Sequence, residues 1–206
     1  MKSLKRHIKE SFKIGKNKIV NTYNYYPKNK WELRKILEYR LKKDKNADLN
    51  DIDVSKIEDM DGIFYSLKPC NIDISDWDVS NAETMINMFY ECSDFDCNLS
   101  KWDVRNVKYM KFMFDGCEKF EGKGLENWQT NSLETTYRMF YGCKNFDCDL
   151  SDWDMSNVED INNMFWRCEK FKGKGLENWN VSNVEDMTNM FFGCDSLKNK
   201  PSWYKE

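Results

Sequence analysis

The sequence has one histidine and three prolines among its 206 residues, and it contains no long hydrophobic run. The single histidine, His7, lies in a basic opening segment, which disfavours Ser-His and Cys-His nucleophile systems and histidine-rich metal sites. No stretch approaches the ~18 apolar residues that a membrane-spanning helix needs. Residues 1–20 also lack the apolar core of a secretory signal. We therefore expect a cytoplasmic protein without a membrane span.

Other catalytic and metal-binding signatures are missing as well. The "GKG" pieces at residues 122–124 and 173–175 are too short for a phosphate-binding loop. The chain has no C-x2-C pair of the kind that binds zinc. Acidic residues recur in every repeat, whereas a catalytic pair of carboxylates should occur once. The sequence therefore predicts a protein that is not an enzyme, with no cofactor, no metal and no small-molecule substrate.

The dominant pattern is a repeat in which tryptophan returns at intervals of 25, 26, 25, 26 and 24 residues. A period of this length is typical of stacked repeats, in which each turn buries its apolar face only against its neighbours. Aromatic, cysteine and aliphatic columns keep the same period. The four columns are Trp77, Trp102, Trp128, Trp153, Trp179 and Trp203; Phe64, Phe89, Phe114, Phe140, Phe165 and Phe191; Cys92, Cys117, Cys143, Cys168 and Cys194; and Ile74, Leu99, Leu125, Leu150 and Leu176.

The first half of each turn has the pattern of a short strand followed by a helix start. The W-x-V alternation places two side chains on one face of an extended segment. Ser80 with Glu83 then has the spacing of a capping box, in which the hydroxyl and the carboxylate satisfy backbone N–H groups at a helix N-terminus. Three further turns carry the same pair, and Asn131 with Glu134 is a variant of it.

The second half of each turn has the spacing of an amphipathic helix. In one turn the apolar residues Val158, Ile161, Met164, Phe165 and Cys168 follow each other at steps of three and four. Glycine follows in several turns and favours a left-handed exit from a helix of two to three turns. These glycines are Gly116, Gly142 and Gly193. In the turns of 26 residues, we expect the glycines of "GKG" to absorb the extra residue in a local bulge.

The repeat "WNVSNVEDMTNMFFGC" and its copies resemble the BspA-type leucine-rich-repeat family, in its version of roughly 25 residues. The resemblance runs from about Asp51 to Trp203, and the segment before it resembles the helical cap of such arrays. It implies an α/β fold, a right-handed leucine-rich-repeat-like solenoid of about six turns that is used for binding. We expect a helix near Trp31–Lys43, with Trp31, Leu33, Ile36, Leu37, Tyr39 and Leu41 on its apolar face, to cover the first turn.

Three regions follow from this organisation: a basic leader over 1–26, the helical cap over 27–50, and the repeats with a C-terminal cap over 51–206. The opening "MKSLKRHIKESFKI" is similar to short leaders on bacteriophage proteins, which implies a phage-encoded protein that could be incorporated in a virion. The alternative interpretation is a basic helix that flanks the cap.

Charge divides the chain sharply. Residues 1–48 hold fifteen Lys or Arg against five Asp or Glu, whereas residues 49–206 hold seventeen against thirty. A basic arm on an acidic array could contact nucleic acid, an anionic membrane or an acidic partner, or it could fold back on its own repeats. Nucleic acid is the less favoured partner, because no RNA- or DNA-binding signature accompanies the basic residues.

The cysteine column favours reduced thiols that pack as small hydrophobic groups. Neighbouring turns are close enough for disulfides, but a vertical ladder would leave odd members unpaired. Disulfides therefore remain the second interpretation of this column.

The candidate binding surface is a polar strip. It is made by the residue between the inward Trp and Val of each strand and by the residue before each Trp. In a leucine-rich solenoid such positions line the face that holds partners. The alternatives are a solvated face without a ligand, or a weak calcium site. The strip comprises Asp76, Asp78, Lys101, Asp103, Asn127, Gln129, Asp152, Asp154, Asn178 and Asn180.

The sequence thus predicts a protein–protein interaction module of unidentified partner and oligomeric state. The alternative is a structural, virion-associated component that docks through the basic leader. A surface adhesin is a third possibility, which requires an export route that the sequence does not display.

The stacked arrangement predicts unequal costs for removing tryptophans. Trp128→Ala, in a central turn, should lower the free energy of unfolding by roughly 3–5 kcal/mol, as a buried large-to-small change. Trp203→Ala, at the end of the array, should cost less. Thermal or urea unfolding of both variants measures the difference, and equal, negligible effects would contradict the stacking.

Overall fold

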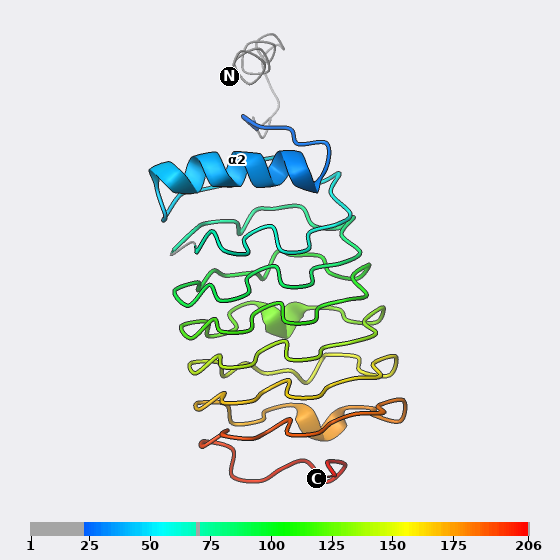
Figure 1. Ribbon diagram of the computed structural model, residues 1–206. Helices are drawn as coiled ribbons and strands as arrows, with labels where there is room; N and C mark the ends of the chain where they lie inside the picture. Colours follow the sequence, from blue (N-terminus) through cyan, green and yellow to red (C-terminus); the bar gives the residue numbers. More distant parts are fainter. Residues whose placement is uncertain (1–22, 69–70, 206) are drawn as a thin grey trace.

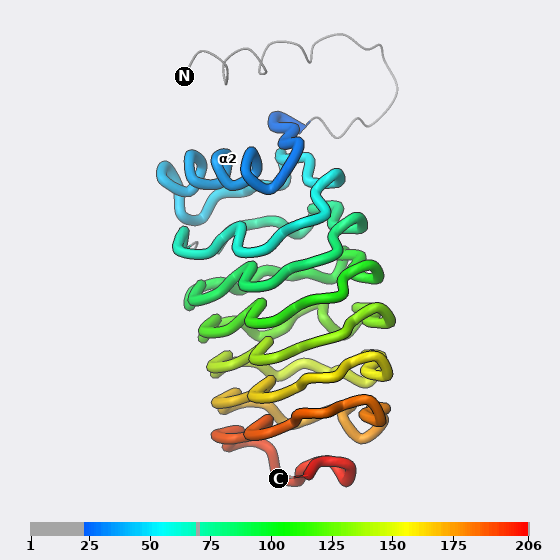
Figure 2. Tube along the Cα trace, turned by 45° about the vertical axis from the view of Figure 1, so that its right-hand side comes forward, coloured from blue at the N-terminus to red at the C-terminus, as the bar shows by residue number. Residues whose placement is uncertain are grey.

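The computed structural model describes residues 23–68 and 71–205. Its coils lie one above another, and a single α-helix, α2 (Lys30–Lys43), crosses the N-terminal end of the stack (Figures 1 and 2). Two short 3-10 helices, η1 (Leu125–Asn127) and η2 (Leu176–Asn178), are the other helices of the described residues. Parallel bridges of one residue link neighbouring coils: Asp59–Thr84, Thr84–Tyr109, Tyr109–Thr135, Thr135–Asp160 and Asp160–Asp186.

The predicted α/β architecture, with a strand and a helix in every turn, is wrong. Over the described ranges no segment forms a strand longer than one bridging residue, and the repeats contain no α-helix. The W-x-V segment is extended at its tryptophan, as at Trp179 with φ −66° and ψ 129°. This extension does not continue into a ladder, because the residues that follow turn immediately.

The segments predicted as helices are runs of overlapping turns. In one coil the N–H groups of Met164, Trp166 and Cys168 donate to carbonyls three residues earlier, at 3.2, 3.1 and 3.0 Å. The N–H groups of the intervening residues bind the next coil. That of Asn163 donates to the Thr188 carbonyl at 3.0 Å, and that of Phe165 donates to the Met190 carbonyl at 3.1 Å. Half of the backbone donors therefore bind within the coil, and the other half bind the coil below.

Two left-handed residues, four positions apart, make this run of turns possible in each coil. Asn163 and Arg167 both have φ 55°. Gly142 and Gly116 take the second of these positions in other coils, with φ 71° and 77°. The expectation of left-handed glycines was correct, but these glycines lie within the run of turns and do not end a helix. A non-glycine residue pays steric strain here, which is why Asn and Gly recur at these positions.

The predicted capping boxes are also wrong. The Ser80 hydroxyl donates to Asp78 Oδ1 at 2.6 Å, and the Ser80 N–H donates to the same oxygen at 3.1 Å. The backbone N–H of Glu83 donates to the Glu58 carbonyl in the preceding coil at 2.8 Å. The aspartate before the serine therefore closes an Asx turn, and there is no helix N-terminus for the serine to cap.

The tryptophan column is buried and its rings lie nearly parallel, with centroids 6.4 Å apart between Trp102 and Trp128. Each indole N–H also reaches the coil above: Trp128 Nε1 donates to the Leu99 carbonyl at 3.2 Å. The same carbonyl accepts the backbone N–H of Trp102 at 3.1 Å, so both of its lone pairs are used. The column thus combines apolar burial with a hydrogen bond between every pair of coils.

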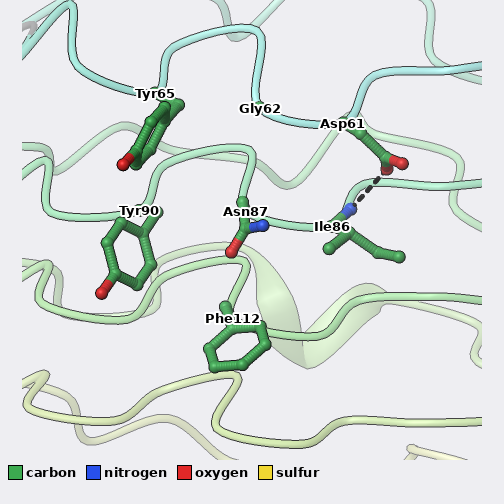
Figure 3. A pocket seen from close by; sticks show the side chains of 7 residues that line it. All are labelled: Asp61, Gly62, Tyr65, Ile86, Asn87, Tyr90 and Phe112. Atoms are coloured by element: carbon green, nitrogen blue, oxygen red, sulfur yellow. Dashed lines mark hydrogen bonds between the residues drawn. The ribbon is translucent and has the colours of Figure 1, made fainter.

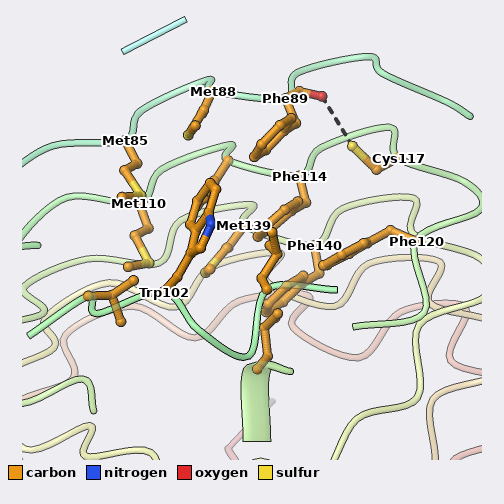
Figure 4. Close-up of a cluster of buried hydrophobic side chains, with 14 of the residues drawn as sticks. Met85, Met88, Phe89, Trp102, Met110, Phe114, Cys117, Phe120, Met139 and Phe140 are labelled. Atoms are coloured by element: carbon orange, nitrogen blue, oxygen red, sulfur yellow. Dashed lines mark hydrogen bonds between the residues drawn. The ribbon is translucent and has the colours of Figure 1, made fainter. Parts of the chain in front are cut away.

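The phenylalanine column lies beside the tryptophan column, and the thiols of the cysteine column repeat this hydrogen bond between coils (Figure 4). Cys117 Sγ donates to the Phe89 carbonyl at 3.1 Å, and that carbonyl also accepts the Cys92 N–H at 2.9 Å. The seven cysteines within the described residues are buried with free thiols. Burial raises the pKa of Cys92 to about 12, so the thiols stay protonated and able to donate.

The helix α2 lies where the sequence predicted one, with Leu33, Leu37 and Leu41 buried against the first coil. Asn29 caps its start, because its Oδ1 accepts the N–H groups of Trp31 and Glu32 at 3.1 and 3.0 Å. The predicted apolar face was too wide: Trp31 is 69% exposed, and Tyr39 also faces outward.

The extra residue in two of the coils creates a position that tolerates no side chain. Gly124, just before η1, has φ 94°, and a Cβ there would lie 2.2 Å from the Ser100 backbone nitrogen. Gly142 also has a positive φ, but a Cβ there would meet nothing closer than 3.9 Å. Substitutions at Gly142 therefore test backbone strain alone, whereas substitutions at Gly124 add a steric clash with the Ser100 backbone.

Gly142→Ala should lower the free energy of unfolding by about 1–2 kcal/mol, the strain of a left-handed alanine. Gly124→Ala should cost at least about 3 kcal/mol, because overpacking against backbone is added to that strain. Urea unfolding followed by circular dichroism measures both. Equal losses in the two variants would show that the close approach at Ser100 does not exist.

Candidate functional site

The polar strip predicted from the sequence lies on the outside of the coils, flanking the buried tryptophans. Eight of its ten residues are exposed, and Asp103 and Asp154 are half-buried. Several of its carboxylates have partners within the stack. Asp103 pairs with Arg105 at 2.6 Å, and Asp154 Oδ1 accepts the Ser156 N–H at 2.9 Å; these bonds lower the pKa of both carboxyl groups. The strip stays a prediction as a binding surface.

A different surface carries the most unusual side chains of the molecule. We call it the ladder face: the outward residues of the turn runs, at 58–66, 83–91, 108–116, 134–142, 159–167 and 185–193. Here the coils are joined by their inter-coil backbone hydrogen bonds. This face carries an aromatic strip, which comprises Tyr65, Tyr90, Phe112, Tyr137, Tyr141, Trp166 and Phe192.

The rings of the aromatic strip contact one another from coil to coil. Tyr65 and Tyr90 have centroids 5.6 Å apart, and Phe112 meets Tyr90 edge-on at 6.3 Å. These three residues, with Ile86 and Asn87, line a groove of about 470 Å³ on the outside of the first three coils (Figure 3). At the other end of the strip, Trp166 stacks on Phe192 at 4.3 Å.

An ion pair occupies the middle of the strip. Asp115 stands where other coils have an aromatic residue, and Arg138 Nε donates to its Oδ2 at 2.9 Å. The Arg138 guanidinium lies 3.8 Å from the Tyr141 ring centroid and 5.5 Å from that of Phe112. The cation therefore bridges the two aromatic halves across the aspartate. Asp115 is buried, and that burial raises its pKa to about 6 despite the arginine.

The ladder face is acidic at the start of its turn runs in the lower coils. Its lower coils form a shallow groove of about 330 Å³, in which five carboxylates lie beside Tyr109, Lys111 and Thr135. We call these five residues the acidic column: Glu134, Glu159, Asp160, Glu185 and Asp186. Desolvation and the nearby Asp186 both raise the pKa of Asp160, which indicates like charges held close together. No set of three or more potential metal ligands is assembled anywhere in the described part of the chain.

The aromatic residues of the strip are visible in the sequence, but the helix prediction did not indicate that they form a continuous surface. An aromatic residue directly follows the buried phenylalanine in most coils, as Tyr90, Tyr141 and Trp166 do. On an amphipathic helix that position is half-exposed at the flank of the apolar face, and an aromatic residue there does not indicate a binding surface. In a run of turns it points outward in every coil, so that the residues form a continuous row.

The buried Asp115 should make stability depend on pH. Because its pKa is raised, the folded protein holds this proton more tightly than the unfolded chain does. Its contribution is fully present below about pH 4 and is lost as the pH rises through about 6, by at most about 3 kcal/mol. Asp115→Asn removes the titration.

Urea unfolding of both proteins between pH 4 and pH 7.5 tests this expectation. The wild type should lose stability relative to the Asn variant as the pH rises. Parallel pH curves for the two proteins would show that Asp115 titrates in the folded state as it does in water.

Comparisons with known proteins place the chain in a family. The sequence profile described as "Mycoplasma protein of unknown function, DUF285" matches residues 32–124 and 98–204, which together include most of α2 and all the coils. A search of curated proteins gave no match, and a search of solved structures gave none. In the described residues no helix has the length and apolar character to cross a membrane. The match agrees with the resemblance to BspA-type repeats, and the chain belongs to the DUF285 family.

Proposed function

We propose that this chain is a non-enzymatic protein-interaction module that binds its partner on the ladder face. The observation that carries the proposal is the aromatic strip, in which two groups of contacting rings on the outside of the stack are joined by Arg138. Apolar side chains that gather on one surface are a common mark of sites of association.

The strip has the composition of a binding hot spot, the small group of residues that contributes most of the binding energy of an interface. Trp, Tyr and Arg dominate such hot spots, and the strip contains Trp166, four tyrosines and the central Arg138. Its ends are the most open, with Tyr65 49% and Phe192 55% exposed. A partner that covers the strip would remove these rings from water along several coils at once.

The strip is also preorganised. Stacking on neighbouring rings holds Trp166 between Tyr141 and Phe192, at 5.5 and 4.3 Å. Arg138 is fixed by Asp115 as well as by the rings beside it. Side chains that are already ordered lose little conformational entropy when a partner binds, which favours affinity.

The state of the thiols supports a role other than catalysis. Burial raises the pKa of Cys148 to about 12 and that of Cys97 to about 11. The thiolate is the reactive form of cysteine, so these residues are poor nucleophiles. Binding by the polar strip around Asp78, a bacteriophage origin, a place in a virion and a cytoplasmic location stay predictions.

Affinity capture from the native host, followed by mass spectrometry and titration of the captured partner, tests the proposal. Phe192→Ser together with Tyr65→Ser should weaken binding at least tenfold, because both remove exposed rings from the strip. Trp31→Ser is the matched control, since it removes an exposed ring from α2.

Asp152→Lys examines the polar strip in the same assay, because Asp152 is exposed there. Loss of binding in this variant, with full binding by the aromatic double variant, would move the site to the polar strip. Circular dichroism of every variant separates lost binding from lost folding.

A further inference from the structure

Six acidic residues outside the ladder face pair with lysines of a neighbouring coil. Each pair joins residues about one period apart, so that the lysine of one coil reaches the acid of the coil above. The pairs are Lys101–Asp76, Lys119–Asp94, Lys123–Asp96, Lys144–Glu118, Lys172–Asp147 and Lys174–Asp149. The repeat therefore neutralises part of its acidic charge on these surfaces.

The acidic column on the ladder face is different. None of its five carboxylates forms an ion pair in the described part of the chain, although Asp186 accepts a hydrogen bond from Asn162 at 2.9 Å. Lys111 is the one cation that lines the groove. The aromatic strip borders this column in the same coils, where Asp160 and Trp166 are separated by a single run of turns. A ligand that is complementary to both the acidic column and the aromatic strip is a basic chain with apolar side chains.

We propose that this ligand is the N-terminal segment of the same chain, residues 1–22, which docks along the ladder face. The segment carries seven Lys or Arg against one acidic residue, Glu10. Leu4, Ile8 and Phe12 interleave with these cations. Its lysines match the acidic column in charge, and its apolar residues match the aromatic strip.

The length of the segment allows this docking. Twenty-two residues reach roughly 70 Å when extended. Six coils at the usual spacing of about 5 Å span roughly 25 Å from the first to the last. The described chain begins at the α2 end of the stack, where Tyr25 bridges to Ile52. The segment therefore reaches the acidic groove of the lower coils with length to spare.

The inference deepens the proposed function and rests on it in one respect, since both place a ligand on the ladder face. The segment would then cover the surface that an external partner needs, and that partner would have to displace it. Exposed ion pairs are individually weak and are screened by salt, so the docking should weaken as ionic strength rises.

Cross-linking of the full-length protein locates the segment. A carbodiimide joins a lysine amine to a carboxylate only when the two groups are in contact. Lysines of residues 1–22 should cross-link to the acidic column, and not to exposed acids elsewhere such as Asp152 and Glu169. An even spread over all acids would overturn the proposal.

A mixture of isotope-labelled and unlabelled protein identifies the source of the segment. Cross-links within one isotope only support docking in the same chain. Mixed links would overturn same-chain docking and show that a second copy supplies the segment.

Charge reversal measures the strength of the contact. Glu134→Lys, Glu159→Lys and Glu185→Lys together should speed tryptic cleavage within residues 1–22 about tenfold. The matched control is Asp152→Lys, Glu169→Lys and Asp195→Lys, which changes three exposed acids outside the column by the same charge. It should leave the cleavage rate within twofold of wild type. High salt should bring the wild type to the rate of the ladder-face variant, and equal rates in both triple variants at low salt would overturn the proposal.

Failure here and failure of the proposed function give different results. If cross-links are absent while partner capture still depends on Phe192 and Tyr65, the segment is not the ligand but the ladder face still binds. If the cross-links are found and partner capture does not depend on Phe192 and Tyr65, the ladder face binds the segment, and the external partner binds elsewhere.

Discussion

The fold depends on backbone N–H groups that only a neighbouring coil can satisfy. In the run from Ile161 to Arg167, every second N–H donates downward to the next coil, at 2.7–3.1 Å. The interior is apolar, so an unpaired donor there would carry a desolvation cost of about 1–3 kcal/mol. All coils must therefore keep one register. The single extra residue of the 26-residue turns is accommodated beside η1 and η2, where Gly124 and Gly175 adopt left-handed conformations and leave the ladder undisturbed.

The same requirement explains why tryptophan and cysteine occupy the inner columns. A carbonyl oxygen has two lone pairs, and the turn within a coil uses only one of them. Trp128 Nε1 takes the second lone pair of Leu99, and Cys117 Sγ takes that of Phe89. A phenylalanine at a tryptophan position, or an alanine at a cysteine position, would be apolar but could not donate a hydrogen bond to the carbonyl. The columns are thus selected for an apolar body that carries one donor, and they hold the coils together as well as filling the core.

The sequence predicted this interior well and the backbone poorly. Burial of the Trp, Phe and Cys columns follows from the period alone, and α2 follows from its cap and its leucines. The backbone did not follow, because a run of turns brings residues i and i+3 inward, as a short helix does. Asn163 followed by Arg167, or Arg138 by Gly142, marks the difference only once the need for positive φ is known. The aromatic strip was lost with the backbone, since its exposure depends on those turns.

The direction of the ladder accounts for part of the charge asymmetry. Most N–H groups that join the turn runs donate to the coil farther from α2, so carbonyls of the first coil point toward that helix without a preceding coil to bind them. Arg34 supplies the donors, at 2.6 Å to the Gly62 carbonyl and 2.8 Å to that of Tyr65, and Lys45 donates to the Leu67 carbonyl. Cations are therefore required at this end, as they are at a helix C-terminus. Arg34 and Lys45, two cations near α2, are therefore used within the fold. The acidic column, in the coils far from α2, forms no ion pair within the described residues, and it is therefore a suitable counterpart for cations such as those of residues 1–22.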